Sequence, residues 1–249
     1  MGRRVSVESG FFDGVEPGDV VALKEGERHY VSNVLRMTEG DEVELFDGLG
    51  HVATGRLEDL EGGRVLIERL ERLDVGESPV EIVLFVAVPK GKRFDWLLEK
   101  ATELGVRGIV PLQTERTVVR IDDRKVARRM ERWEAIVAGA ARQCGRSRTP
   151  ELYRPRGVRE ALEDPSCGVH LAGLLSGDRQ TVEEALEGEQ PKRVGVWIGP
   201  EGDFTSGEAA RLVEAGVRAV DLGPRILRVD TAAVVAVTLV QGAVGDLRG

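Results

Sequence analysis

The sequence predicts a two-part α/β protein, in which a small β-barrel precedes a larger domain built on a mostly parallel sheet. Short strand-like segments separated by Gly and Asp-Gly turns fill residues 1–73. From residue 78 onward, continuous apolar runs alternate with amphipathic helices, which is the pattern of parallel α/β sheets. Hydrophobic residues make up 41% of the 249-residue chain, enough for a real core. The predicted domains are therefore residues 1–73 and 78–249.

In the first domain, four segments have the composition of strands. They are VVAL, DEVELFDG, HVATGRLEDL and RVLIERLERL. The second and third of these predict a hairpin, because Asp47-Gly48 lies between them and favours a tight turn. One helical segment, GERHYVSNVLRMTEGD, interrupts the strands. The stretch ERLDVGESPVE has few apolar residues and is predicted to be a linker.

In the second domain, EIVLFVAVPK is a continuous apolar run, typical of a strand buried on both faces. An amphipathic helix follows in RFDWLLEKATELG, with Phe94, Leu97, Leu98, Ala101 and Leu104 on one side and a stop at Gly105. The next strand is VRGIVPLQ, and a long basic helix is predicted over 124–143. Three later strands are predicted in GVHLAG, RVGVWIG and AVDLG.

Composition and charge limit the classes of function. Cys144, Cys167 and three scattered histidines have no metal-ligand spacing, so we expect no metal site. No apolar run approaches the roughly 20 residues of a membrane span, and the N-terminus does not resemble a signal peptide. We therefore expect a soluble cytoplasmic protein with no membrane partner. The net charge is −8, yet residues 116–154 carry eleven Lys or Arg against five acids. This basic segment is either a polyanion-binding patch or a solvated helix face.

Two loops are candidate ligand sites. The apolar run VGVWI ends at GPEG, and a helix follows with Thr205 or Ser206 as N-cap and Glu208 in its first turn. The chain lacks GxxxxGK[ST] and GxGxxG, which argues against a P-loop or dinucleotide fold. GPEG is either an ordinary turn or a ligand loop. The second loop, GPRILRV, precedes a helix capped by Asp230 or Thr231. It is either a plain strand–loop–helix connection or, because Ile226 and Leu227 are apolar residues in a loop, the cover of a ligand pocket.

Two groups of cations are candidates for phosphate contact. Lys90, Lys92 and Arg93 follow the first buried strand, at the edge where ligands of open α/β sheets bind. Arg142, Arg146 and Arg148 end the long helix. Guanidinium groups suit phosphate recognition, although they also complement the dipole of a helix C-terminus.

Five segments, in order along nearly the whole chain, resemble the signatures of the RsmE family, the 16S ribosomal RNA (uracil-N3) methyltransferases of the SPOUT superfamily. They are HYVSNVLRMTEGD, KGKRFDWLLEKATELGV, RQCGRSRTPEL, IGPEGDFTSGE and LGPRILRVDTA. Five ordered signatures at proper spacing are specific, although any one alone would not be. Two positions depart from the family pattern: Asp203 stands where a second Gly is common, and Asp230 where Glu is common.

The resemblance implies a PUA-like N-terminal barrel, a C-terminal SPOUT domain with a deep trefoil knot, and a homodimer. It implies S-adenosylmethionine as cofactor and 16S rRNA of the small ribosomal subunit as partner. HLAGLL, IGPEG and LGPRILRV would line the cofactor pocket. The implied cofactor-binding residues are Leu171, Ala172, Gly173, Ile198, Gly199, Pro200, Glu201, Gly202, Leu222, Gly223, Ile226, Leu227, Arg228 and Thr231. The implied RNA-binding residues are Arg36, Lys90, Lys92, Arg93, Arg142, Arg146 and Arg148.

Methylation at N3 of uracil requires loss of a weakly acidic proton. Arg228 is the first candidate to stabilise the developing charge on a uracil oxygen, and Glu201 is a candidate base or orienting group. Glu201 could instead cap the following helix. Three other functions stay open: a non-catalytic RNA-binding or ribosome-assembly module, a nucleotide-dependent transferase or kinase, and a SPOUT enzyme that methylates another RNA position.

Overall fold

The computed structural model describes residues 3–72, 74–119, 123–163, 166–175 and 177–247. The contacts divide the chain into two compact units. The N-terminal unit comprises residues 1–77 and 141–149, and the C-terminal unit comprises residues 78–140 and 150–249. The predicted division was contiguous, whereas the structure groups residues 141–149 with the first unit. Among the described residues, no helix has both the length and the apolar character of a bilayer span.

The N-terminal unit contains a five-stranded sheet with the order β1-β3-β4-β5-β2. Its strands are β1 (Arg4–Ser6), β2 (Val20–Ala22), β3 (Glu42–Phe46), β4 (His51–Asp59) and β5 (Arg64–Arg72). The β3–β4 hairpin confirms the predicted turn at Asp47-Gly48, because Phe46 pairs with Val52 across it. Alternate residues of these strands point into one apolar core. β1 pairs with β3 in parallel and the other pairs are antiparallel.

The helical segment of this unit is shorter than predicted. It consists of α1 (Glu25–His29) and a π-helical turn, η1 (Tyr30–Val34), rather than a helix over 26–41. Just after η1, Arg36 adopts a left-handed backbone with φ of 51°. A π turn followed by a left-handed non-glycine residue is a strained local structure. The strain explains why a uniform helix does not continue to Asp41.

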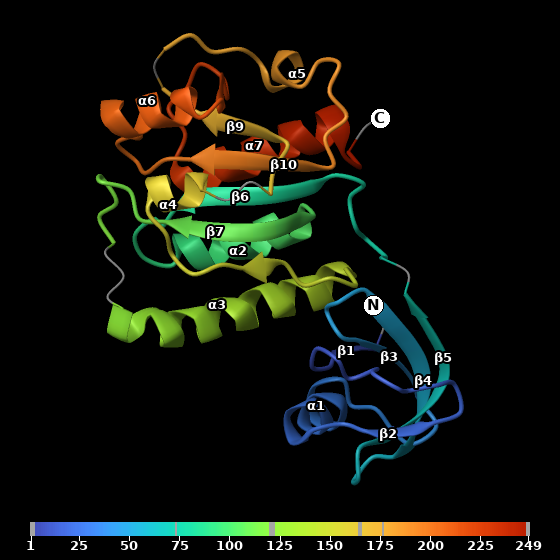
Figure 1. The fold of residues 1–249 in the computed structure, drawn as a ribbon. Coiled ribbons are helices and arrows are strands. Elements are labelled where there is room, and N and C mark those ends of the chain that lie inside the picture. Colours follow the sequence, from blue (N-terminus) through green and yellow to red (C-terminus); the bar gives the residue numbers. More distant parts are fainter. Residues whose placement is uncertain (1–2, 73, 120–122, 164–165, 176, 248–249) are drawn as a thin grey trace. The chain divides into compact units, whose positions relative to one another are not determined.

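The C-terminal unit is built on a six-stranded parallel sheet with the order β11-β9-β10-β6-β7-β8 (Figure 1). The strands are β6 (Glu81–Ala87), β7 (Val106–Leu112), β8 (Glu151–Leu152), β9 (Val169–Gly173), β10 (Arg193–Ile198) and β11 (Arg218–Val220). β6 is buried from Ile82 to its end, as its continuous apolar run predicts. Because all pairs are parallel, the carboxyl ends of the strands meet at one edge.

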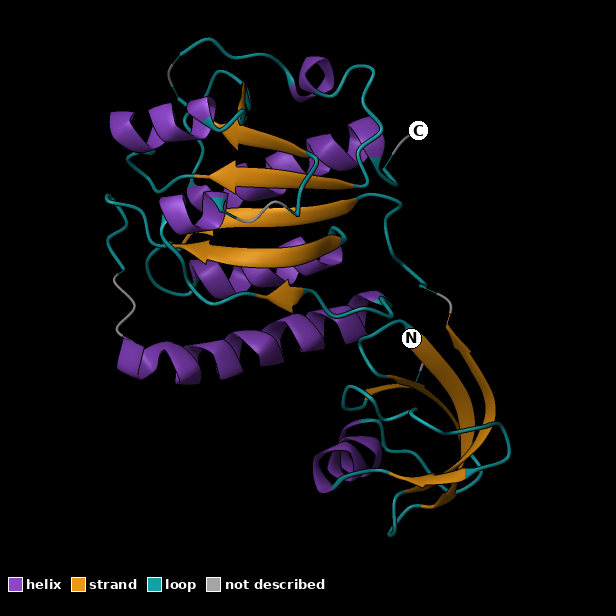
Figure 2. Ribbon diagram, viewed as in Figure 1, coloured by secondary structure: helices purple, strands orange, loops and turns teal. Residues whose placement is uncertain are grey.

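Helices cover both faces of this sheet, which gives three layers (Figure 2). One face packs against α2 (Arg93–Glu103), α3 (Asp123–Cys144), α5 (Val182–Ala185) and α7 (Val229–Val244). The other packs against α4 (Val158–Leu162) and α6 (Ser206–Glu214). On that second face Trp197 stacks on Phe85 with 4.1 Å between ring centroids, and its indole N–H donates to His170 Nδ1 at 3.0 Å.

The end of α2 agrees with the sequence prediction, whereas the start of α7 does not. α2 buries Phe94, Leu97, Leu98 and Ala101 as predicted, and it ends before Gly105, whose φ of 79° suits glycine. For α7, Asp230 or Thr231 was the expected N-cap, but Arg228 holds that position and the helix begins at Val229. Asp230 instead lies in the first turn, where its negative charge still complements the helix dipole.

The predicted linker is anchored rather than free. Its residues Asp74 and Glu77 accept hydrogen bonds from the 146–148 segment within the N-terminal unit. The Val75 carbonyl accepts the Ser147 N–H at 3.0 Å. The low apolar content of this stretch therefore reflects polar bonding partners and not freedom of the chain.

Candidate active site

A cleft lies at the carboxyl ends of β9, β10 and β11, with about 510 Å³ of empty space that includes open solvent at its mouth. Three loops line it. They contribute Gly173, Leu174, Leu175 and Arg179 after β9; Ile198, Gly199, Pro200, Glu201 and Asp203 after β10; and Asp221, Leu222, Gly223, Arg225, Leu227, Val229 and Ala232 after β11. Ligands of open parallel sheets bind at this kind of edge.

The cleft has an apolar wall. Ile198 and Leu222 meet over Gly173, where any side chain would come within 2.8 Å of Leu222 Cδ1 and 3.3 Å of Ile198 Cδ1. Glycine at position 173 therefore lets the two aliphatic side chains close over the end of β9. Leu227 lies further along the same lining. Such a surface suits the face of a planar base.

The loop after β10 is held firmly on its far side. Thr205 caps α6 and forms a capping box with Glu208, a residue that is only 3% exposed. Glu208 Oε1 also accepts the N–H of Glu115 at 2.9 Å. In addition, the Arg116 guanidinium donates to the carbonyls of Gly202 and Phe204. The expected Thr205 cap is confirmed, and Glu201 does not cap this helix.

Asp203 has a left-handed backbone with φ of 59°. Glycine adopts this conformation without strain, which gives a physical reason for the glycine common at this position in the RsmE pattern. Here the Asp203 carboxylate accepts the Leu175 N–H at 2.9 Å and the Phe204 N–H at 2.8 Å. The departure from the family pattern thus brings a side chain that joins two walls of the cleft.

Charged groups of both signs line the cleft. Arg179 donates to the Leu174 carbonyl at 3.2 Å and lies 3.6 Å from the carboxylate of Asp221. Glu201 is half exposed, and its carboxylate lies 3.9 Å from the Arg93 guanidinium at the start of α2. Arg225 completes the set. Three carboxylates (Glu201, Asp203 and Asp221) and two guanidinium groups (Arg179 and Arg225) thus line the cleft, and Arg93 lies beside it.

The structure brings together eight of the expected cofactor-binding residues. Gly173, Ile198, Gly199, Pro200, Glu201, Leu222, Gly223 and Leu227 all line the cleft. Six others lie elsewhere. Leu171 and Ala172 are buried inside β9. Gly202 is exposed beside the cleft, and Ile226 is 80% exposed. Arg228 is the exposed N-cap of α7, and Thr231 is exposed on the same helix. Ile226 was expected to cover a base, but it faces solvent in this chain.

Four charged residues of the lining were missed: Arg179, Asp203, Asp221 and Arg225. Arg225 stands in the GPRILRV loop together with Arg228, and the sequence alone does not show which of the two arginines reaches the cleft. Asp221 lies within the predicted strand AVDLG, but β11 ends at Val220, so that Asp221 begins the loop at the carboxyl edge of the sheet. For Arg179 the sequence offers no comparable signal, because it follows β9 in a loop without a recognisable pattern.

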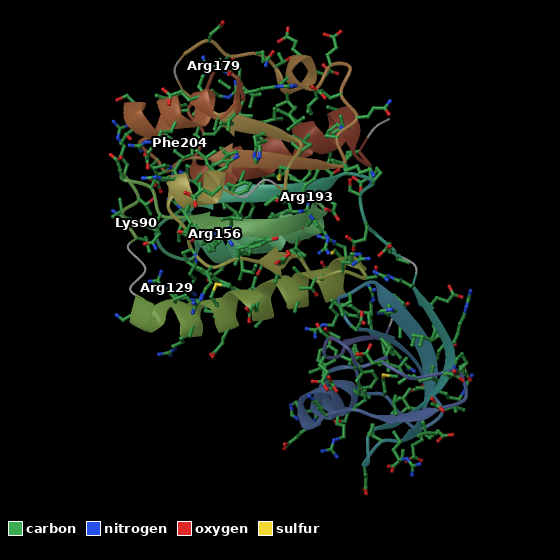
Figure 3. All side chains as sticks on the ribbon, in the orientation of Figure 1. Lys90, Arg129, Arg156, Arg179, Arg193 and Phe204 are labelled. Carbon is green, nitrogen blue, oxygen red and sulfur yellow. The ribbon has the colours of Figure 1, made fainter. Side chains whose placement is uncertain are left out.

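The first group of expected RNA contacts lies at the same sheet edge as the cleft. Lys90 and Lys92 are exposed, and Arg93 begins α2. Figure 3 shows Lys90 on the edge of the C-terminal unit where Phe204 also lies. β6, which leads into this loop, pairs directly with β10, which leads into GPEG. These cations therefore flank the cleft.

The second group of expected RNA contacts, Arg142, Arg146 and Arg148, has partners within the N-terminal unit. Arg146 is 2% exposed and its guanidinium forms a two-point ion pair with Glu77, at 2.7 and 3.3 Å. Arg148 bonds Asp74 at 2.6 Å, and Arg142 stacks over the Tyr30 ring at 4.4 Å. The structure thus does not present Arg146 to a phosphate, because an internal carboxylate holds it. Arg36 is exposed on its strained backbone. Arg120 and Asp122 of the basic segment lie outside the described residues.

Two known domain families match the chain. Residues 76–241 match an RNA methyltransferase domain, and residues 23–68 match an RNA methyltransferase PUA domain. Among curated relatives, the ribosomal RNA small subunit methyltransferase E of Mycobacterium bovis is 32% identical over 93% of this chain and 88% of its own length. The enzyme of the same name from Bacillus subtilis is 30% identical over 94% of each chain.

Solved structures agree with these relatives. A methyltransferase of Legionella pneumophila, in complex with the bound cofactor SAM, shares 34% identity and a TM-score of 0.88 over 99% of both chains. A ribosomal RNA small subunit methyltransferase E from Neisseria gonorrhoeae, bound to S-adenosyl methionine, shares 33% identity and a TM-score of 0.85 over 99% of both chains. The likeness extends over both units of the present chain.

Proposed function

Because the chain belongs to the RsmE family of ribosomal RNA small subunit methyltransferases, we propose that it methylates N3 of a uridine in 16S rRNA, with S-adenosylmethionine as methyl donor. The chain is an S-adenosylmethionine-dependent rRNA methyltransferase. The observation that carries the finer proposal is the cleft at the ends of β9, β10 and β11, formed by the three loops in which the family resemblance places the cofactor. Residues 1–73 would serve as the PUA-like RNA-binding domain and residues 78–249 as the catalytic domain.

The residues of the cleft fit this cofactor. Ile198, Leu222 and Leu227 offer an apolar wall for an adenine ring, and the glycines at 173, 199 and 223 leave room for close approach of a ligand to the backbone. The carboxylates of Asp203 and Asp221 line the cleft and could attract the positive charge of the sulfonium. When bound, S-adenosylmethionine supplies an electrophilic methyl group on a positively charged sulfur.

Residues of this chain must then align the uracil with the methyl group and accept the proton that leaves N3. Glu201 and Asp221 are the half-exposed carboxylates of the lining, and Asp221 lies beside Arg179. We assign Glu201, in the GPEG loop, to accept or orient that proton. The Arg93 guanidinium, 3.9 Å away, would orient the Glu201 carboxylate at the cleft edge. Arg228 stays our first candidate for stabilising a uracil oxygen, and Arg225, which lines the cleft, is the second.

The RNA must present an unpaired or flipped uridine, because N3 lies on the Watson–Crick edge. Lys90 and Lys92 flank the cleft and would contact phosphates next to the target nucleotide. We also propose a homodimer and a deep trefoil knot in the C-terminal unit. The 80% exposure of Ile226 and the 42% exposure of Leu239 support an apolar surface available to a second copy. The knot is proposed from the family resemblance.

Calorimetric titration with S-adenosylmethionine and, separately, with ATP tests the cofactor assignment. We expect binding of the first and none of the second. Incubation with undermethylated small subunits and labelled cofactor, followed by nucleoside mass spectrometry, should then yield N3-methyluridine. A different methylated nucleoside would assign the chain to another position of the RNA. RNA binding without cofactor binding or methyl transfer would favour the non-catalytic module.

Substitution of the two arginines separates their roles. If Arg228 stabilises the uracil anion, Arg228→Ala should lower kcat by about 100-fold or more with little change in cofactor affinity. If Arg225 stabilises the uracil anion instead, Arg225→Ala should show the same fall in kcat with little change in cofactor affinity. Single-turnover rates on small subunits measure the effect. Unchanged rates in both variants would remove both arginines from the chemical step.

A further inference from the structure

The backbone of Asp203 is in a conformation that residues with a Cβ rarely adopt. Its φ is 59°, and among the non-glycine residues that the structure describes only Arg36 and Asp74, both in the N-terminal unit, also have a positive φ. A left-handed residue other than glycine needs compensating interactions. The Asp203 N–H donates to the Pro200 carbonyl at 2.9 Å, which closes the turn, but glycine would make this bond equally well.

The compensation comes from the carboxylate. Its Oδ1 accepts the N–H of the next residue, Phe204, at 2.8 Å. Its Oδ2 accepts the N–H of Leu175 at 2.9 Å, and Leu175 belongs to the loop after β9. Both Asp203 and Leu175 line the cleft, on two of its three loops. The carboxylate is therefore a bridge between the loop of β9 and the loop of β10.

We propose that Asp203 is a positioning residue that holds these two loops in the conformation that binds S-adenosylmethionine. This inference rests on the proposed function of the cleft. A loop that is already fixed loses less freedom when a ligand binds, so the bridge should raise cofactor affinity. Charge-assisted hydrogen bonds from a carboxylate to backbone N–H groups are among the stronger ones, which suits them to this role.

Removal of the carboxylate should leave the fold intact. The loop after β10 keeps its other supports, because Arg116 still donates to the Gly202 and Phe204 carbonyls and Glu208 still holds Thr205 and Glu115. Asp203→Gly also relieves the backbone strain. The substitution therefore separates cofactor affinity from stability: thermal stability should stay equal or rise while affinity falls.

The test compares Asp203→Gly with Asp203→Asn in the full-length protein. Asparagine tolerates the left-handed backbone and keeps one oxygen that can accept the Leu175 N–H. Titration calorimetry should show cofactor binding about tenfold weaker for Asp203→Gly and within about threefold of wild type for Asp203→Asn. At saturating cofactor, kcat should fall by less than about threefold in both, so that the effect appears in KM.

Hydrogen exchange supplies a readout that does not depend on the cofactor. In the unliganded protein, the Leu175 amide should exchange faster in Asp203→Gly than in wild type or Asp203→Asn. Asp74→Gly is the matched control, because Asp74 also has a left-handed backbone, with φ of 44°, but lies in the N-terminal unit. It should change neither Leu175 exchange nor cofactor affinity.

Two results would overturn the proposal: cofactor affinity of Asp203→Gly within twofold of wild type, or equal losses in the Gly and Asn variants. The second result would mean that the negative charge, and not the bridge, affects binding. If wild type itself fails to bind S-adenosylmethionine, the proposed function fails instead. Unchanged exchange at Leu175 would then still reject the bridge on its own.

Discussion

Arg146 has a different role in the structure from the one that its sequence context predicts. In the sequence it is one of several cations in RQCGRSR, a pattern that indicates phosphate contact. In the structure it is an internal partner of Glu77, which lies 69 positions earlier. The charge count could not reveal this, because the carboxylate that neutralises Arg146 is distant in the chain. Lys90 and Lys92, by contrast, are exposed, so their role as RNA contacts stays a prediction.

Substitution of Arg146 should therefore affect stability. Arg146→Ala leaves the Glu77 side chain, 11% exposed, without its paired cation. We expect the free energy of unfolding to fall by about 3 kcal/mol. Arg142→Ala, which removes only the stacking on Tyr30, should cost about 1 kcal/mol or less. Urea denaturation followed by far-ultraviolet circular dichroism measures both. A loss below 1 kcal/mol for Arg146→Ala would contradict the role assigned to the ion pair.

Among the elements, predictions were accurate where burial dominates and less so where local capping decides. β7, β9 and β10 lie within one residue of the predicted runs, and β6 ends three residues before its run does, because strands buried on both faces must be continuously apolar. The start of α7 was wrong because Asp230 is a common N-cap type, while the structure uses the backbone of Arg228. The helix at 26–41 failed because a π turn and the left-handed Arg36 interrupt it, and composition does not encode either.

The element that sets the geometry of the cleft is the N-terminus of α6. Glu208 accepts hydrogen bonds from the backbone of Thr205 and of Glu115, and a glutamine side chain would offer only one accepting oxygen. Glu208→Gln should lower the free energy of unfolding of the C-terminal unit by about 2 kcal/mol. Thr205→Ala should cost about 1 kcal/mol. Glu214→Gln, exposed at the end of the same helix, is the control and should be neutral. Equal stability of Glu208→Gln and Glu214→Gln would refute the anchoring role.

For the whole molecule, the sequence predicted the two-part architecture and eight residues of the cleft lining. It did not predict that residues 141–149 belong with the N-terminal unit, since that grouping depends on bonds from 146–148 to Asp74 and Glu77. Nor did it predict the charged residues of the lining other than Glu201. Asp203 and Arg179 come from separate loops, and their approach follows from the order of strands in the sheet.

RNA binding should depend on the edge of the sheet that carries the cleft. The double variant Lys90→Glu/Lys92→Glu should bind rRNA more weakly and reduce the slope of log K against log salt by about 1.5, as expected for two lost phosphate contacts. Lys192→Glu is the matched control, because Lys192 is exposed just before the start of β10, at the opposite edge. Filter binding at several salt concentrations measures the slopes. Equal slopes for the double variant and Lys192→Glu would exclude Lys90 and Lys92 from the interface.

The stacked pair of Trp197 and Phe85 has a practical consequence. All three tryptophans of the chain, Trp96, Trp133 and Trp197, lie in the C-terminal unit, so tryptophan emission reports on that unit alone. Trp197 directly precedes Ile198, which lines the cleft. The protein thus carries a built-in optical reporter one residue from its ligand site, and titrations or unfolding of the catalytic half can be followed without any added label.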